Sequence, residues 1–305
     1  MFCFIALLVF SVLGIFSATH RKFAKEAFDC VFRRITFRPC NTGFREKVRG
    51  IILVKLMKRS SFFAKVFNKY FELIAWIFFV LMIVSTFYVG RGAYNFYLYG
   101  NCNGVNEEGF CLFDPTGENN KISPVAPTCG LDTPTVDDLS LANTDLDKFF
   151  FIDNNSEDTV VFIGCYVCDF TRKAFPDIEK LLEKKKPNFY FGHLPVKHGS
   201  DFISSYDYCA REDTSGDYWK FVELMFTSDI ENINDQNYLQ EVVDKAGYDK
   251  SKIDECLADP ETLASIEQNI FNIGNTNIYG TPLVFVNNKA IVGPKPYRVY
   301  KGFLK

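Results

Sequence analysis

The chain of 305 residues carries two cysteines, Cys165 and Cys168, that are separated by two residues. They follow the apolar run 159–164, which predicts a buried strand, and precede a segment in which apolar residues recur at helical spacing. A strand, a C-x-x-C pair and a helix in this order are typical of a dithiol/disulfide redox centre. The unpaired N–H groups and dipole of a helix N-terminus stabilise a thiolate there, and cysteines one turn apart can close a disulfide. The pattern therefore indicates redox chemistry carried by sulfur.

Other kinds of site also use C-x-x-C. The pair could be half of a zinc or iron–sulfur site, or a structural bridge that never opens. A copper(I)-handling factor would use both sulfurs as soft ligands, and a binding module would use the fold only to dock a partner. We favour thiol–disulfide exchange, with a partly exposed Cys165 forming the mixed disulfide and Cys168 resolving it. The dipeptide Tyr166-Val167 is then expected to tune the stability of the thiolate.

A second feature lies far downstream, in residues 279–293. This segment predicts a turn, a strand, an Asn-Asn turn and a second strand. Pro282 enters the first of these strands and has no N–H for the ladder. It therefore belongs at the strand's first residue, where an X-Pro bond can be cis. An ordinary hairpin would have the same pattern.

Together, the C-x-x-C helix start and the Gly-Thr-Pro hairpin resemble the thioredoxin fold, and specifically its DsbA-like branch. The resemblance covers residues 137–305, with a helical insertion at about 200–272, and its order of strands and helices agrees with the family. It implies an α/β fold in which a cis-proline loop, here Thr281 and Pro282, faces the active cysteines and offers backbone to an extended substrate.

The resemblance also implies an activity and partners. It implies a protein dithiol–disulfide oxidoreductase that donates its disulfide to exported, cysteine-containing clients and is reoxidised by a membrane redox partner. Isomerase or reductase action would use the same residues with a different potential and partner. Its redox group would be the Cys165–Cys168 disulfide, with no further cofactor and no metal. Family members often carry proline and histidine between the cysteines, so Tyr166-Val167 is a departure that bears on the redox potential. His193, in a predicted core strand, is interpreted as a hydrogen-bonded structural residue rather than a base.

Two uncharged apolar stretches of 17 residues, 2–18 and 73–89, precede this region. Each is long enough to cross a bilayer with help from flanking residues. The loop between them, residues 19–69, holds 14 Lys and Arg against 3 Asp and Glu, so the positive-inside rule places it in the cytoplasm. We therefore predict transmembrane helices at 1–18 and 70–90, N-out and C-out, with the catalytic domain on the extracytoplasmic side. A cleaved signal peptide is the alternative for the first stretch.

Charge is divided unevenly along the chain. Residues 1–90 carry 14 basic and 4 acidic side chains, whereas residues 91–305 carry 20 basic and 33 acidic ones. The acidic part offers no basic stripe, so nucleic acid is not expected as a partner.

Residues 91–136 predict an extracytoplasmic tether, because Gly, Asn and Pro are frequent and apolar periodicity is absent. Cysteines exported to an oxidising compartment usually pair. Cys102 with Cys111 would close a small local loop. Cys129 would then be left over, either as an intermolecular thiol or as a thiol buried where the tether docks.

Four further cysteines lie in the helical insertion and in the loop between the two apolar stretches. Cys209 and Cys256, in the helical insertion, are expected either to form a second structural disulfide or to remain separate buried thiols. Cys30 and Cys40 fall in the predicted cytoplasmic loop and are expected to be reduced. Their spacing is unlike that of zinc knuckles, so no metal site is predicted there.

Overall fold

A computed structural model describes residues 6–7, 9–11, 15, 17–36, 38, 43–58, 60–107, 109–125, 134–197 and 201–305. The chain divides into two compact units, Met1–Arg91 and Gly92–Lys305, and each is described by itself. The first predicted membrane span, residues 2–18, lies largely outside the described residues.

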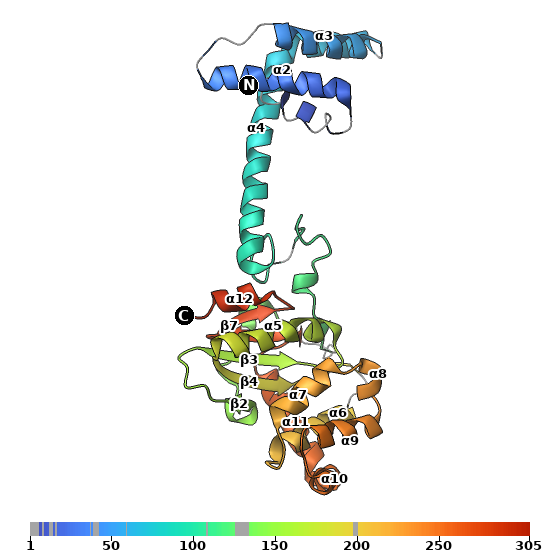
Figure 1. Cartoon of the computed structure of the whole chain (residues 1–305), viewed down its shortest axis with the longest axis vertical. Coiled ribbons are helices and arrows are strands. Elements are labelled where there is room, and N and C mark those ends of the chain that lie inside the picture. The colour runs from blue at the N-terminus through green and yellow to red at the C-terminus, as the bar shows by residue number, and fades with distance from the viewer. Residues whose placement is uncertain are drawn as a thin grey trace. The chain divides into compact units, whose positions relative to one another are not determined.

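The N-terminal unit is helical. Helices α2 (Ala18–Ile35) and α3 (Gly43–Met57) precede the long helix α4 (Ser61–Tyr99), which continues into the C-terminal unit (Figure 1). A small apolar cluster that includes Ala27, Cys30 and Phe44 holds the first two helices together.

Cys30 is disulfide-bonded in the structure, which corrects its expected reduced state. The expected reduced state follows from the positive charge of residues 19–69, which predicts a cytoplasmic loop. Disulfides persist in oxidising compartments and are rare in the cytosol, so this bond opposes the cytoplasmic placement of residues 19–69.

Helix α4 has 39 residues and contains an 18-residue stretch with a mean hydropathy of 2.3, none of which is buried. Among the described residues it is the one helix long and apolar enough to cross a membrane. The span predicted at 70–90 lies within it. The backbone of Tyr70, with φ −107° and ψ 18°, marks a kink near the start of that span. Two membrane helices are not confirmed.

The C-terminal unit is built on a five-stranded sheet in the order β2-β4-β3-β6-β7. Strands β3 and β4 are parallel, and the other neighbouring pairs are antiparallel. The central strands β3 and β6 are apolar almost throughout, which fits strands that are covered on both faces. The strands are β2 (Phe150–Ile152), β3 (Thr159–Gly164), β4 (Asn188–His193), β6 (Leu283–Val286) and β7 (Lys289–Val292).

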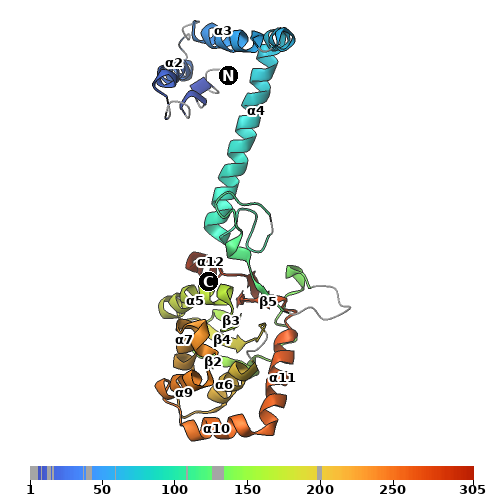
Figure 2. The ribbon, with the colours of Figure 1, turned by 90° about the vertical axis from the view of Figure 1, so that its right-hand side faces the viewer.

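Alternate residues of β3 pack into two separate cores. Val160 and Phe162 belong to the cluster that contains residues of α5 (Asp169–Lys185), whereas Val161 and Ile163 belong to the cluster that contains Ile273 of α11 (Pro260–Gly274). Figure 2 shows α11 on the opposite side of the sheet from α5 and α7. The period of two along β3 therefore sets a three-layer arrangement with helices on both faces.

The helical insertion predicted at about 200–272 corresponds to six helices between β4 and the C-terminal strands. Aspartates at the N-caps of four of them accept backbone N–H groups, which satisfies donors that a helix start leaves unpaired. The helices of the insertion are α6 (Asp201–Glu212), α7 (Tyr218–Thr227), α8 (Ile230–Ile233), α9 (Gln236–Lys245), α10 (Lys250–Ala258) and α11. Helix α12 (Tyr297–Gly302) follows the sheet, and short 3-10 helices lie at Glu118–Asn120, Val136–Asp138 and Leu146–Lys148.

The structure differs from the predicted tether. Residues 92–125 belong to the same compact unit as the sheet. The Asn106 side chain donates to the carbonyl of Ala290 at 2.8 Å and accepts from the N–H of Val292 at 2.9 Å. A two-residue strand, β1 (Ser123–Pro124), pairs with β5 (Gly280–Thr281). The asparagines, which in sequence indicate loops, here act as hydrogen-bonding groups that hold this segment against the domain.

Candidate active site

The C-x-x-C pair lies in a turn between β3 and α5. The N–H of Cys168 donates to the carbonyl of Cys165 at 3.2 Å, and α5 begins at Asp169 with Cys168 as its N-cap residue. Cys165 therefore precedes the first helical residue by one turn. The predicted order of strand, cysteine pair and helix is present.

Both cysteines are reduced and fully buried, with 0% exposure for each, and Tyr166 between them is also 0% exposed. This differs from the partial exposure expected for Cys165. Backbone of Val196 reaches the sulfur of Cys165, and the hydroxyls of Ser123 and Thr281 lie beside Cys168. Segments distant in sequence thus close over the pair.

The two thiols have opposite acidities. The pKa of Cys165 is lowered to about 6, chiefly because the Cys168 side chain hydrogen-bonds to its sulfur. Burial acts against this shift, whereas the electrostatic interaction with His193 and hydrogen bonds from backbone groups of Val196 and Val167 support it. The pKa of Cys168 is raised by the same hydrogen bond and by burial. At neutral pH the pair therefore holds one thiolate, on Cys165, and one thiol.

The Thr281-Pro282 peptide bond is cis, and both residues are buried. The hydroxyl of Thr281 has no hydrogen-bond partner within the described part of the chain. The structure thus brings the Thr281-Pro282 loop and the cysteine pair together, from segments more than a hundred residues apart.

Tyr166 contacts the protein interior on all sides. Its hydroxyl donates to Asp207 Oδ1 at 2.5 Å, and Tyr218 donates to the same oxygen at 2.7 Å. Burial first, and then the charge of Asp207, raise the pKa of both tyrosines. The predicted tuning dipeptide is therefore anchored to the helical insertion, and Asp207 is a residue that sequence reasoning did not identify.

His193 ends β4 opposite Gly164 in the parallel register with β3. Its ring stacks on Tyr166 at a centroid distance of 4.5 Å. Both ring nitrogens are buried without a hydrogen-bond partner among the described residues. This corrects the interpretation of His193 as a hydrogen-bonded structural residue. Its position beside Cys165 makes it an electrostatic neighbour of the thiolate.

Arg172, in the first turns of α5, ties the C-x-x-C turn to the end of α7. Its guanidinium donates to the carbonyls of Tyr166 at 2.6 Å, Met225 at 2.8 Å, Phe226 at 3.0 Å and Ser228 at 2.5 Å. These carbonyls include ones that a helix C-terminus leaves unpaired. The sequence offered no signal for this role, because the acceptors are backbone groups.

Residues 208–305 match the family model of the DSBA-like thioredoxin domain. The match begins after the C-x-x-C pair and includes the Thr281-Pro282 loop. Together with the mixed sheet, the match supports a thioredoxin-like DsbA fold for the C-terminal unit, as predicted.

Solved structures with some likeness to the DsbA-like domain were also found. BdbD from Bacillus subtilis is 20% identical over 54% of this chain and 92% of its own, with a TM-score of 0.45. A thioredoxin-like oxidoreductase from Silicibacter pomeroyi DSS-3 is 19% identical over 51% and 90%, with a TM-score of 0.45. The thiol-disulfide exchange protein alpha-DsbA2 from Wolbachia pipientis is 18% identical over 50% and 83%, with a TM-score of 0.40. Likenesses this distant carry no argument about activity. No curated protein matches the chain.

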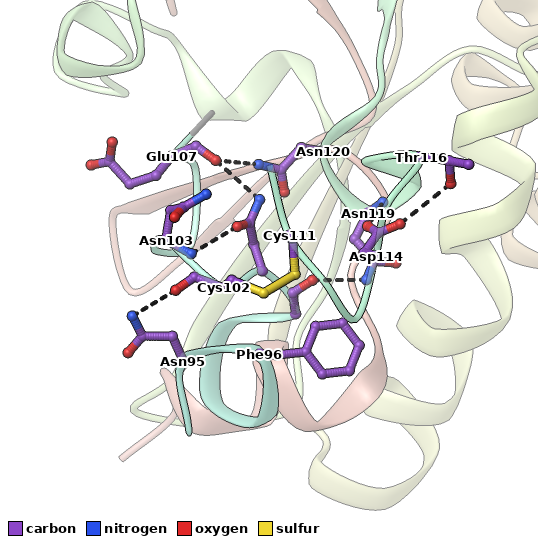
Figure 3. Close-up of a disulfide and its surroundings, with 12 residues drawn as sticks. Asn95, Phe96, Cys102, Asn103, Glu107, Cys111, Asp114, Thr116, Asn119 and Asn120 are labelled. Atoms are coloured by element: carbon purple, nitrogen blue, oxygen red, sulfur yellow. Dashed lines mark hydrogen bonds between the residues drawn. A yellow bond between two sulfur atoms is a disulfide. The ribbon is translucent and has the colours of Figure 1, made fainter. Parts of the chain in front are cut away.

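Two further disulfides cross-link the unit that holds the DsbA-like domain. Cys102 is joined to Cys111, and Cys209 in α6 is joined to Cys256 in α10. Figure 3 shows the Cys102–Cys111 bond near Phe96, in a loop whose asparagine side chains form hydrogen bonds to its backbone. Cys129 and Cys40 lie outside the described residues.

No group of three or more His, Cys, Asp or Glu side chains in the described ranges is placed to hold a metal ion. A DsbA-like oxidoreductase needs none, because its redox group is the cysteine pair.

Proposed function

We propose that this chain is a thiol–disulfide oxidoreductase that acts on cysteine-containing proteins through Cys165 and Cys168. The observation that carries the proposal is the pair's asymmetry beside the Thr281-Pro282 loop, in a DsbA-like domain. Cys165 has a pKa of about 6, and the Cys168 thiol hydrogen-bonds to it. A thiolate at neutral pH is both the nucleophile and the better leaving group in exchange.

The proposed reaction proceeds in two exchanges. A client thiolate attacks Cys165 of the oxidised pair, which forms a client–Cys165 disulfide and releases the thiolate of Cys168. A second client thiolate then attacks the client sulfur of that bond, forms the client disulfide and releases Cys165 as a thiolate. The client loses two electrons, the pair gains them, and the proton released by the second client thiol is available to Cys168.

The direction we propose is disulfide donation. A thiolate that is stabilised in the reduced state makes the disulfide a stronger oxidant. The pKa of about 6 lies between the value of about 7 for thioredoxin and about 3.5 for DsbA. We therefore expect a reduction potential between about −270 mV and about −120 mV, the values of those two proteins. A membrane redox partner would reoxidise the pair.

We also propose that α4 tethers the domain to a membrane, with the domain on the extracytoplasmic side. The length of α4 and its unburied apolar surface support the tether. The Cys102–Cys111 and Cys209–Cys256 bonds support an oxidising compartment. The two-pass, N-out and C-out arrangement stays a prediction, which the Cys30 disulfide opposes.

The test uses the full-length chain with Cys168→Ser. In this variant the Cys165 thiolate can attack a client disulfide and release one client sulfur as a thiolate. The Cys168 thiol that would displace the bound client is gone, so mixed disulfides should accumulate and disappear on reduction. The double variant Cys165→Ser/Cys168→Ser is the matched control and should trap nothing. A single variant that traps no adduct while the protein is folded would count against the proposed activity. Equilibration with glutathione then measures the potential and decides the direction.

A further inference from the structure

The chain's own strand β1 lies on the edge of the Thr281-Pro282 loop. It pairs antiparallel with β5, with Ser123 opposite Thr281 and Pro124 opposite Gly280. The pairing continues beyond the strand, because the N–H of Val125 donates to the carbonyl of Tyr279 at 3.0 Å. The residues that precede the cis-proline are therefore already paired with backbone from the same molecule.

The pairing is close and in register. In an antiparallel ladder, opposed residues alternate between bonded and non-bonded pairs. The bond between Val125 and Tyr279 makes the Pro124–Gly280 position a non-bonded one, so the missing N–H of proline costs nothing there. A Cβ on Gly280 would lie 2.5 Å from the Ile122 side chain and 2.8 Å from the carbonyl oxygen of Ser123. Glycine at 280 is thus what permits this strand to approach.

Side chains of the same segment fill the surroundings of the cysteines. The Ser123 hydroxyl lies beside the Cys168 thiol. Ile122 and Val125 pack against the apolar cluster that contains Ile163 and Leu283. Serine has the shape of cysteine with oxygen in place of sulfur. The segment therefore resembles an extended client peptide in which Ser123 occupies the position of the client cysteine, next to the redox pair.

The arm that leads into β1 is braced. The Cys102–Cys111 disulfide closes its loop, and the carbonyl of Glu107 accepts the side-chain amides of Asn101 at 3.0 Å and Asn120 at 2.8 Å (Figure 3). The side chain of Asn120 also accepts a hydrogen bond from the buried ammonium of Lys295. A strand delivered by a braced arm has a high local concentration at its binding edge.

We propose that Ile122–Val125 is an intramolecular strand that occupies the client edge of the cysteine site, so that a client must displace it before exchange. The edge would take an extended, unfolded segment whose cysteine comes to the register position of Ser123, by strand addition. This inference rests on the proposed function. It accounts for a reduced cysteine pair in which both side chains are 0% exposed, although the pKa of Cys165 is low enough for reaction with a client.

The first test places a cysteine at the contact. In a Cys165→Ser background, Ser123→Cys should form a disulfide with Cys168 when oxidised glutathione is added, and two reduced glutathione molecules are released per bond. Pro124→Cys is the matched control, because successive residues of a strand point to opposite faces. Mass spectrometry of the unreduced digest should find the 123–168 cross-link and no 124–168 cross-link. Equal yields from both would overturn the docked register.

The second test weakens the strand in the otherwise natural chain. Val125→Pro removes the N–H that pairs with Tyr279, and Ile122→Ser removes an apolar contact as an independent variant. Each should raise the rate at which Cys165 is alkylated by iodoacetamide by roughly fivefold to tenfold. That factor corresponds to about one net hydrogen bond for Val125→Pro and to part of an apolar side-chain contact for Ile122→Ser. The thiolate ultraviolet absorbance should titrate as in the natural chain, which separates access from acidity.

Failure of this inference is distinguishable from failure of the proposed function. If alkylation and client trapping in the Cys168→Ser background are as fast with Val125 and Ile122 intact as with either replaced, the strand does not occlude the site although exchange stands. If the variants speed alkylation but no client is trapped, the occlusion stands and the proposed activity is wrong.

Discussion

His193 and Tyr166 stack with their ring centroids 4.5 Å apart, and this places the imidazole beside the Cys165 thiolate. The pairing follows from the register of β3 and β4, in which His193 lies opposite Gly164, the residue before Cys165. Helix α5 begins only at Asp169. Cys165 lies ahead of the first helical residue, and the hydrogen bond from the Cys168 side chain is the largest cause of its lowered pKa.

Replacing His193 by glutamine should raise the pKa of Cys165. The change removes the electrostatic interaction of the imidazole with the sulfur and keeps a polar side chain, so we expect a rise of about 0.5 to 1 pH unit. The pH dependence of thiolate absorbance measures it. Tyr190→Phe, on the same strand, is the control and should leave the titration unchanged. An unchanged titration in His193→Gln would show that the histidine has no electrostatic role.

Replacing Arg172 by methionine should destabilise the domain. The change leaves the four carbonyls that the guanidinium joins without their charged donor, at a cost of about 2 to 4 kcal/mol. Denaturant unfolding of the oxidised chain measures the loss. Lys185→Met, at an exposed position of the same helix, should change stability little. Equal effects of the two substitutions would refute the bracing role of Arg172.

Replacing Tyr166 by phenylalanine removes a buried hydroxyl that donates to Asp207 at 2.5 Å. We expect a loss of about 1 to 2 kcal/mol, because a hydrogen bond to a buried carboxylate is lost while Tyr218 still donates. The redox potential should change little, since the ring and its stacking remain. A large shift in potential without a loss of stability would mean that the hydroxyl acts on the cysteines and not on the fold.

Breaking the Cys209–Cys256 bond should weaken the helical insertion. The bond joins α6 to α10 across a sequence separation of 47 residues. In the chain-entropy model such a loop contributes about 4 kcal/mol, so the variant with both cysteines changed to alanine should unfold at clearly lower denaturant. Catalytic thiol acidity should be retained. Unaltered stability would indicate that the helices hold the insertion without the bond.

The stability of the reduced chain should rise relative to that of the oxidised chain as pH increases above about 6. Folding lowers the pKa of Cys165 from 9.0 to about 6, so between these values the unfolded state binds more protons than the folded state. Stability of the reduced form then rises with pH by at most about 1.4 kcal/mol per unit, and this gain is lost as pH falls through about 6. Unfolding both redox forms across this range measures the difference. A difference that is flat with pH would contradict the cited shift.

The parts of this fold that could be predicted from sequence are local. The apolar run before Cys165, the two-residue spacing and the helical pattern after it are contiguous, and together they predict strand, turn and helix. The Gly-Thr-Pro hairpin is equally compact. These short patterns, with the resemblance they carry, were enough to predict the DsbA-like fold.

The remaining features are long-range and depend on tertiary structure. The Tyr166 hydroxyl donates a hydrogen bond to Asp207, 41 residues away in sequence, and the Asn106 side chain donates one to the carbonyl of Ala290, 184 residues away. Local sequence propensity assigns Asn106 to a loop. It contains no information about the Ala290 carbonyl, which only the tertiary fold brings next to the asparagine side chain. For the same reason the burial of Cys165 was not predicted. The strand that lies over the site comes from a segment whose composition is that of a linker.

The most direct measurement of the central claim is the titration of Cys165 in the reduced, full-length chain by thiolate absorbance, with Cys165→Ser as the subtracted control. The account predicts a midpoint near pH 6. A midpoint near that of an ordinary cysteine, about 8.5, would contradict it, because the sulfur would then be a thiol at neutral pH with no advantage in exchange.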